Sequence, residues 1–291
     1  TRVRSSAASD VYKRQVPGYD GNDDAYITYV YARNLARGLG FVFYPGAQQV
    51  LGTTTPLYAL LLAALAKMGL PIPQTSMVLG ALGAVACAAL MAALGKRAGY
   101  PAAGIAAAAL AFAGPGWWRA VAGMETPLYA ALILGAIYAT ASGRQRWAYA
   151  LGALAAIVRI DGIAVLAAVV AVSLYQRSFR LRDVVPPVLL LAVWFCWLTW
   201  TFGSPIPTSG EAKVLEQWIS GRFAIPLPIL VAATWSAARA RRQPVVQGLI
   251  AWLAAYLVGL TLVGLPSFSW YYAPAGLAIV LLACVAAQDL S

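Results

Sequence analysis

Apolar runs repeated along the whole chain constrain this sequence more than any other feature. Of 291 residues, 61% are hydrophobic and 11% are charged, and the mean hydropathy is +0.72. A helix of about 20 apolar residues can cross a bilayer, because its backbone groups bond to one another. We therefore predict an all-α, polytopic membrane protein with roughly nine transmembrane helices. The predicted spans are residues 76–94, 101–116, 127–142, 147–158, 162–175, 184–202, 224–237, 245–264 and 272–287.

Basic residues gather in four short clusters between these runs. Cytoplasmic loops of membrane proteins are enriched in Lys and Arg, so the clusters predict the cytoplasmic side. Two predicted spans separate each consecutive pair of clusters, as this interpretation requires. The net charge of +11 therefore reflects membrane topology, and we expect no nucleic-acid partner. The clusters are Lys96/Arg97, Arg144/Arg146, Arg177/Arg180/Arg182 and Arg239/Arg241/Arg242.

Each span takes the chain to the other side of the membrane, so counting spans from these clusters places the remaining loops on the outer side. These are residues 20–55, 117–126, 159–162, 202–222 and 265–273. The apolar run 57–70 is too short to cross, and Pro56 marks its start, so we predict a helix at the membrane surface.

The N-terminal segment 1–15 is treated separately. It begins without Met and resembles translated adapter sequence, so we expect it to be a non-native leader and one preceding transmembrane helix to be missing. Residues 16–291 are then one transmembrane domain. Its first outer loop is 18–56.

Asp23 and Asp24 form a tandem carboxylate pair in a chain with only ten acidic residues. They open a predicted amphipathic helix that runs to about Arg37, with Gly38 beyond its end. The positive end of a helix dipole favours the ionised carboxylate. Each Asp is therefore a candidate base or metal ligand, in preference to a general acid.

The residue types present exclude several kinds of site. The chain has no histidine, which rules out Ser-His-Asp triads and HExxH zinc sites. Its three cysteines, Cys87, Cys196 and Cys284, lie in separate apolar runs and are predicted to be small buried hydrophobic residues. Chemistry must come from carboxylates, Arg, Lys, Tyr or a divalent metal cation.

Three ionisable residues of the outer loops are candidates for binding substrate. Glu125 precedes a helix start at Thr126-Pro127, where it is either a substrate contact or a carboxylate stabilised by the helix dipole. Arg159 and Asp161 join two short apolar segments, and ionisable residues at membrane depth are functional candidates. The alternative for these two is a structural ion pair.

Lys213 and two tyrosines complete the outer candidates. Lys213 follows the rigid Ser-Pro-Ile-Pro turn at 204–207 and could contact a phosphate, or lie in a solvated loop. Tyr271 and Tyr272 could stack on a sugar or contact a polyprenyl chain, or belong to an interfacial aromatic belt.

A carboxylate pair on the outer face suits glycosyl transfer from a lipid-phosphate sugar. A carboxylate can accept the proton of the attacking hydroxyl, and a cation must stabilise the departing phosphate. A single displacement inverts the anomeric centre.

The chain resembles the GT-C class of multi-pass glycosyltransferases, which use polyprenyl-phosphate sugars and include protein mannosyltransferases, aminoarabinose transferases and arabinofuranosyltransferases. The resemblance covers about residues 18–287. It implies that Asp23 first, and Asp24 second, acts as base or metal ligand. Val30 stands where relatives usually carry Arg, so Arg33, Arg159 or Lys213 would contact the donor phosphate. The motifs are Asp23-Asp24-Ala25-Tyr26-Ile27-Thr28, Gly52-Thr53-Thr54-Thr55-Pro56-Leu57, Gly123-Met124-Glu125-Thr126, 159–162, 203–207 and Trp270-Tyr271-Tyr272.

The resemblance further implies a bacterial inner (plasma) membrane location, an active site facing the periplasm, and a glycan, lipid or protein acceptor. Two other functions remain open from the sequence. A transporter or flippase of lipid-linked sugars would place polar groups along a midplane pathway and would not turn over donor. A non-catalytic subunit of a cell-envelope complex is the third.

Overall fold

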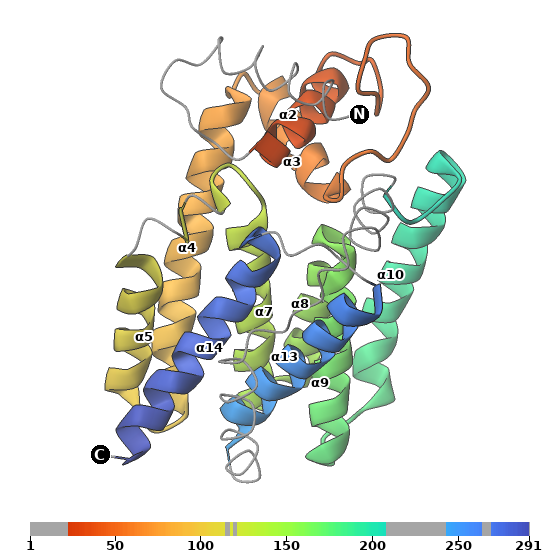
Figure 1. Cartoon of the computed structure of the whole chain (residues 1–291). Helices are drawn as coiled ribbons and strands as arrows, with labels where there is room; N and C mark the ends of the chain where they lie inside the picture. The colour runs from red at the N-terminus through yellow and green to blue at the C-terminus, as the bar shows by residue number, and fades with distance from the viewer. Residues whose placement is uncertain (1–22, 114–116, 119–120, 208–242, 264–268, 291) are drawn as a thin grey trace.

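The computed structural model describes residues 23–113, 117–118, 121–207, 243–263 and 269–290 (Figure 1). Every regular element within these ranges is helical, which confirms the all-α prediction for this part of the chain. The segment 1–15, the predicted span 224–237, Lys213 and the basic cluster at 239–242 lie outside the described residues. The elements are α2 (Asp23–Ala36), α3 (Pro56–Lys67), α4 (Ile72–Arg97), α5 (Pro101–Ala113), α7 (Thr126–Ala141), α8 (Gln145–Val158), the 3-10 turn η1 (Ile160–Gly162), α9 (Ile163–Tyr175), α10 (Leu181–Phe202), α13 (Pro244–Val263) and α14 (Ser269–Leu290).

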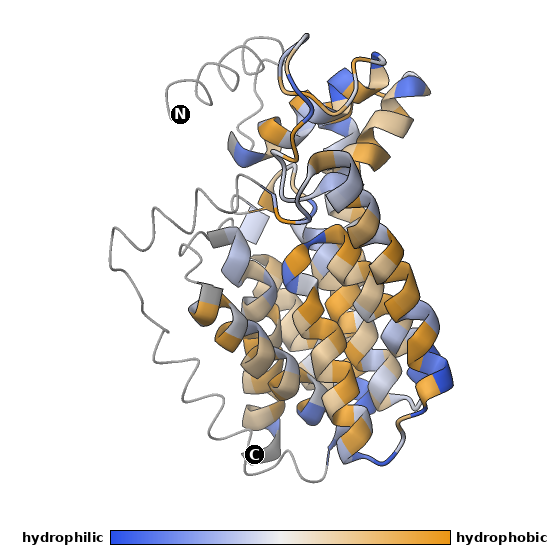
Figure 2. Cartoon of the chain, turned by 90° about the vertical axis from the view of Figure 1, so that its right-hand side faces the viewer, coloured by the Kyte–Doolittle hydropathy of each residue, from blue (hydrophilic) through white to orange (hydrophobic). Residues whose placement is uncertain are grey.

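The helices from α4 onward form a bundle in which the direction reverses at each described junction, while α2 and α3 lie across one end (Figure 1). The described basic clusters fall at the opposite end, at the end of α4 and at the α7–α8 and α9–α10 junctions. Figure 2 shows apolar residues along the bundle and hydrophilic residues concentrated toward its two ends. The alternation predicted from charge therefore agrees with the arrangement of these helices.

Four described helices are long and apolar enough to cross a membrane: Ile72–Arg97, Leu181–Phe202, Pro244–Leu262 and Trp270–Gln288. The predicted count of nine spans is not confirmed. The helices α5, α7, α8 and α9 have only 13, 16, 14 and 13 residues, and about 20 are needed to cross the hydrocarbon core. The described helices are compatible with a lipid bilayer environment.

The surface layer of α2 and α3 is joined to the bundle by buried tyrosines. Tyr29 of α2 is fully buried and hydrogen-bonds the Ser76 hydroxyl of α4. Its hydroxyl also lies 3.1 Å from the carbonyl oxygen of Gly123, just before α7. Tyr58 of α3 donates to the Ser76 carbonyl. This layer is therefore held at a fixed height above α4 and α7.

Small residues allow α4 and α5 to approach closely. A Cβ added at Gly95 would stand 2.4 Å from the Cα of Gly104, and one at Gly104 would stand 2.7 Å from the Met91 carbonyl oxygen. Close backbone contact through small residues is a principal source of helix association in lipid. Gly95 and Gly104 therefore fix α5 against the C-terminal half of α4.

We expect Gly95→Ala to destabilise the protein by about 1–3 kcal/mol, because its methyl group would meet backbone that cannot move aside. The measurement is thermal unfolding of the full chain in detergent. The control is Gly259→Ala in α13, where an added Cβ has no described neighbour within 4 Å. That change should be neutral or stabilising by up to about 1 kcal/mol. Equal melting temperatures for the two variants would contradict this account of the α4–α5 contact.

Candidate functional site

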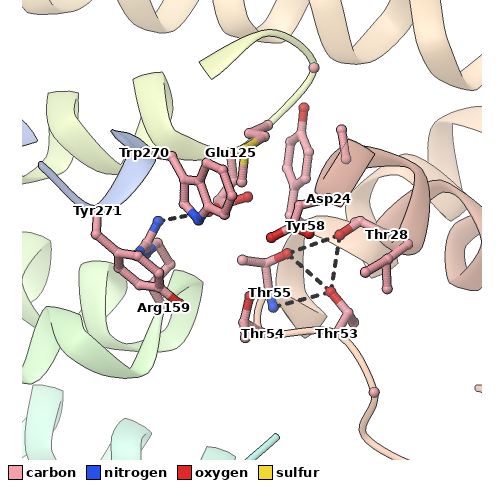
Figure 3. A pocket seen from close by; sticks show the side chains of 15 residues that line it. Asp24, Thr28, Thr53, Thr54, Thr55, Tyr58, Glu125, Arg159, Trp270 and Tyr271 are labelled. Atoms are coloured by element: carbon pink, nitrogen blue, oxygen red, sulfur yellow. Dashed lines mark hydrogen bonds and ion pairs between the residues drawn. The ribbon is translucent and has the colours of Figure 1, made fainter. Parts of the chain in front are cut away.

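A pocket forms where the surface layer meets the bundle, at the end where α7 and α14 begin. One wall is the start of α2 with the segment before α3, and the other is the start of α7, the α8–α9 junction and the start of α14. Figure 3 shows Asp24 on the first wall, facing Glu125, Arg159, Trp270 and Tyr271 on the second. The lining residues are Asp24, Ala25, Ile27, Thr28, Gly52, Thr53, Thr54, Thr55, Tyr58, Gly123, Met124, Glu125, Arg159, Trp270 and Tyr271.

The Arg159 guanidinium is the electrostatic centre of the second wall. It is 5% exposed and forms a forked pair with Asp161, with Nε–Oδ1 at 3.1 Å and Nη2–Oδ2 at 2.8 Å. Its Nη1 donates to Glu125 Oε1 at 3.1 Å. Three of its five N–H donors are thus engaged by carboxylates. The structure places Arg159 and Asp161 in the ion pair that the sequence offered as the structural alternative.

Aromatic rings enclose the same guanidinium. Its central carbon lies 4.9 Å from the ring centre of Tyr129 and 4.8 Å from that of Tyr271. Tyr256 lies with its hydroxyl oxygen 3.2 Å from Asp161 Oδ2 and 2.8 Å from the Tyr271 carbonyl oxygen, so it can donate to either. Cation–π contacts strengthen where water is excluded. The cluster therefore ties α7, α13 and α14 to the α8–α9 junction.

The local sequence explains why Arg159 reaches this position. Helix α8 ends at Val158, Arg159 is extended (φ −145°, ψ 135°), and η1 turns the chain directly into α9. Gly162 closes the turn against α8, where an added Cβ would lie 2.3 Å from the Ala155 backbone. Only glycine permits this tight return, and the return points Arg159 into the bundle.

Glu125 occupies the N-cap position of α7, but its side chain forms no cap hydrogen bond because it faces Arg159. The predicted helix start at Thr126-Pro127 is confirmed. Burial raises the pKa of the Glu125 carboxyl above its ordinary value, and the Arg159 guanidinium opposes that rise. The pair brings a carboxylate to the pocket wall and compensates most of its charge.

Three threonine hydroxyls lie together on the first wall. Thr28 Oγ1 is 3.0 Å from Thr53 Oγ1 and 3.4 Å from Thr55 Oγ1. Thr55 is at the N-cap position of α3 but forms no side-chain cap bond. Its hydroxyl instead joins the cluster that fixes the 53–55 segment beside Asp24.

The structure brings together several predicted site residues and separates others. Asp24, Glu125, Arg159 and Tyr271 line the pocket, and Asp161 supports Arg159 from behind. Arg33 and Tyr272 do not line it. The Asp23 side chain and Lys213 lie outside the described residues, although Asp23 is the first residue of α2.

Sequence reasoning missed Tyr129, Tyr256 and the threonine cluster. Tyr129 follows Glu125 by four residues, so helical spacing alone places the two on one face. Thr53 and Thr55 lie within the motif at residues 52–57, which by itself predicts only the start of a helix. Tyr256 lies in an apolar run, and nothing in its spacing indicates a partner 95 residues away.

The pocket is small and partly open as its side chains stand. Its volume is about 20 Å³, room for about one water molecule. Among the described residues, no three acidic, cysteine or histidine side chains come together as a metal site. A sugar or a lipid phosphate can enter only if part of a wall moves.

Comparison with known proteins gives no relative. No family model matches this chain, and neither a curated protein nor a solved structure matches it. Any functional conclusion must therefore come from the residues and their geometry.

We expect Arg159→Met to destabilise the protein by about 3–5 kcal/mol, because it leaves Glu125 and Asp161 buried without their counter-charge. Thermal unfolding in detergent measures the loss. Arg182→Met is the control, since that side chain is 77% exposed and should change stability by less than about 0.5 kcal/mol. If Arg159→Met and Arg182→Met had the same melting temperature, the ion-pair cluster would not stabilise the fold.

Proposed function

We propose that this protein is an integral-membrane glycosyltransferase that moves a sugar from a polyprenyl-phosphate carrier to an acceptor hydroxyl. The acceptor is a glycan, lipid or protein of the cell envelope. The reaction takes place at the outer (periplasmic) face of the bacterial inner membrane and inverts the anomeric centre.

One observation carries this proposal: Asp24 shares a pocket with Glu125, Arg159 and Tyr271. Four distant parts of the chain meet there, at the end of the bundle away from the basic clusters. If those clusters face the cytoplasm, the pocket faces outward. A donor that is anchored in the bilayer could then reach it beside the helices.

The chemistry assigns a base to the first wall. The acceptor oxygen forms a new bond to the anomeric carbon as the bond from that carbon to the phosphate oxygen breaks. The electron pair leaves with the polyprenyl phosphate, and the hydroxyl proton passes to the Asp24 carboxylate. With no histidine in the chain, a carboxylate is the natural base at neutral pH.

The leaving phosphate needs positive charge. Arg159 retains two N–H donors beyond the three that its carboxylates engage. Its net charge is largely balanced, so its main task is to hold Glu125 and Tyr271 in place. A divalent cation would supply the missing charge. Asp24 with Asp23 is the candidate ligand pair, although the described residues form no complete metal site.

The size of the pocket sets a further requirement. Because its volume is about 20 Å³, donor binding must displace the wall formed by Trp270 or the 52–55 segment. Trp270 and Tyr271 would then present aromatic faces to the sugar, as many carbohydrate sites do.

We expect Asp24→Asn to lower sugar transfer at least about 100-fold, the usual contribution of a general base. The full-length protein is incubated with a panel of polyprenyl-phosphate sugars and release of polyprenyl phosphate is followed. Asp23→Asn is measured in parallel, since the resemblance assigns the first Asp that role. Asp289→Asn, near the distant end of α14, is the matched control and should retain activity.

Two results would contradict the proposal. Near-normal transfer by both Asp23→Asn and Asp24→Asn would remove the base assignment. No turnover of any donor by the folded wild-type protein, together with movement of a lipid-linked sugar across vesicles, would favour the flippase alternative.

A further inference from the structure

A second cavity lies at the other end of the bundle, between the α7–α8 and α9–α10 junctions. Its volume is about 490 Å³, and four arginines and one carboxylate line it. The formal charge of these groups is +3. The charged residues are Arg144, Arg146, Arg177, Arg180 and Asp183.

Within the described part of the chain, the four guanidinium groups form no ion pair. Among the described residues, no carboxylate lies within 4.0 Å of any of them, and Asp183 is nearest to Arg182, at 3.9 Å. Elsewhere at this end, Arg97 is used structurally, donating Nε and Nη2 to the Ala141 carbonyl at 3.0 and 2.8 Å. The arginines of the cavity have no such internal task.

The floor of the cavity is fixed. Gln145 is 7% exposed, its Nε2 donates to Ser178 Oγ at 3.0 Å, and its Oε1 accepts from Ser173 Oγ at 3.0 Å. The ring of Phe179 contacts that of Tyr149, with centres 6.4 Å apart. These bonds hold the two junctions together, so the backbones that carry the four exposed arginines are fixed around one space.

The backbone contributes in both directions. Helices α8 and α10 begin at this cavity, and the N-cap residues Arg144 and Arg180 make no side-chain cap bond. Because α7 and α9 end at the same junctions and helix C-termini oppose anions, the positive potential comes from the arginine side chains. Arg177 is held at φ 56°, a conformation that costs energy in a residue with a side chain.

We propose that this cavity binds the phosphate headgroup of an anionic membrane lipid. Arginine clusters bind phosphate through paired N–H donors, and basic pockets at the cytoplasmic side of membrane helices suit such headgroups. The surroundings favour a lipid over a free anion. Trp147 lines the cavity and is 67% exposed. Along α10, the apolar side chains Leu181, Val185 and Leu189 are exposed where acyl chains would lie.

The test measures lipid binding by native mass spectrometry of the full chain in detergent. Phosphatidylglycerol, phosphatidylcholine and inorganic phosphate are titrated separately. The variant Arg144→Gln/Arg180→Gln removes two charges from the cavity, and Lys96→Gln/Arg182→Gln removes two from the same end outside it. We expect the first to weaken phosphatidylglycerol binding at least about tenfold, since each basic residue contributes near a surface, and the second to change it less than about twofold.

Asp183→Asn separates binding from a structural role. It removes the one carboxylate that lines the cavity and should tighten phosphatidylglycerol binding several-fold, whereas loss of fold would weaken it. Equal losses in the two double variants, or no preference for phosphatidylglycerol over phosphatidylcholine, would overturn the proposal. Binding of inorganic phosphate as tight as that of the lipid would overturn the lipid assignment.

Discussion

The buried guanidinium of Arg159 organises the end of the bundle that meets the surface layer of α2 and α3. Removing a full charge from water costs far more than one contact returns, so the fold must surround it with compensating groups. Arg159 has carboxylates on two sides and rings on two faces. These partners come from α7, the α8–α9 junction and α14, so satisfying one charge aligns three parts of the chain.

The same constraint explains the short helices around it. Helices α8 and α9 are shorter than a bilayer span, and they meet at a tight turn in which Arg159 and Gly162 are buried while Ile160 and Ile163 are exposed. Polar backbone at such a turn needs internal partners. Arg159 and Asp161 lie at that turn, which places a fixed polar wall where α2 can cover it.

Much of this arrangement follows from the sequence. Apolar runs and the placement of basic clusters predict the positions of the described helices within a few residues. They do so because the cost of placing charge in lipid depends on residue type, which the sequence shows directly. Glu125, Arg159, Asp161 and Tyr271 follow from rare polar residues in apolar surroundings. Tyr256 could not be found, since its bond to Asp161 depends on how α13 packs. Thr55 and Glu125 occupy N-cap positions without side-chain cap bonds, because their side chains contact tertiary partners instead.

The two ends of the bundle differ in charge, and this has a consequence for the proposed reaction. The candidate site sets Asp24, Glu125 and Asp161 against Arg159, whereas the distant cavity sets four arginines against Asp183. A departing phosphate would enter a site whose fixed charges already sum to a negative value, and repulsion grows where water is excluded. If the proposed glycosyl transfer takes place there, a cation beyond Arg159 would have to balance the charge of the leaving phosphate.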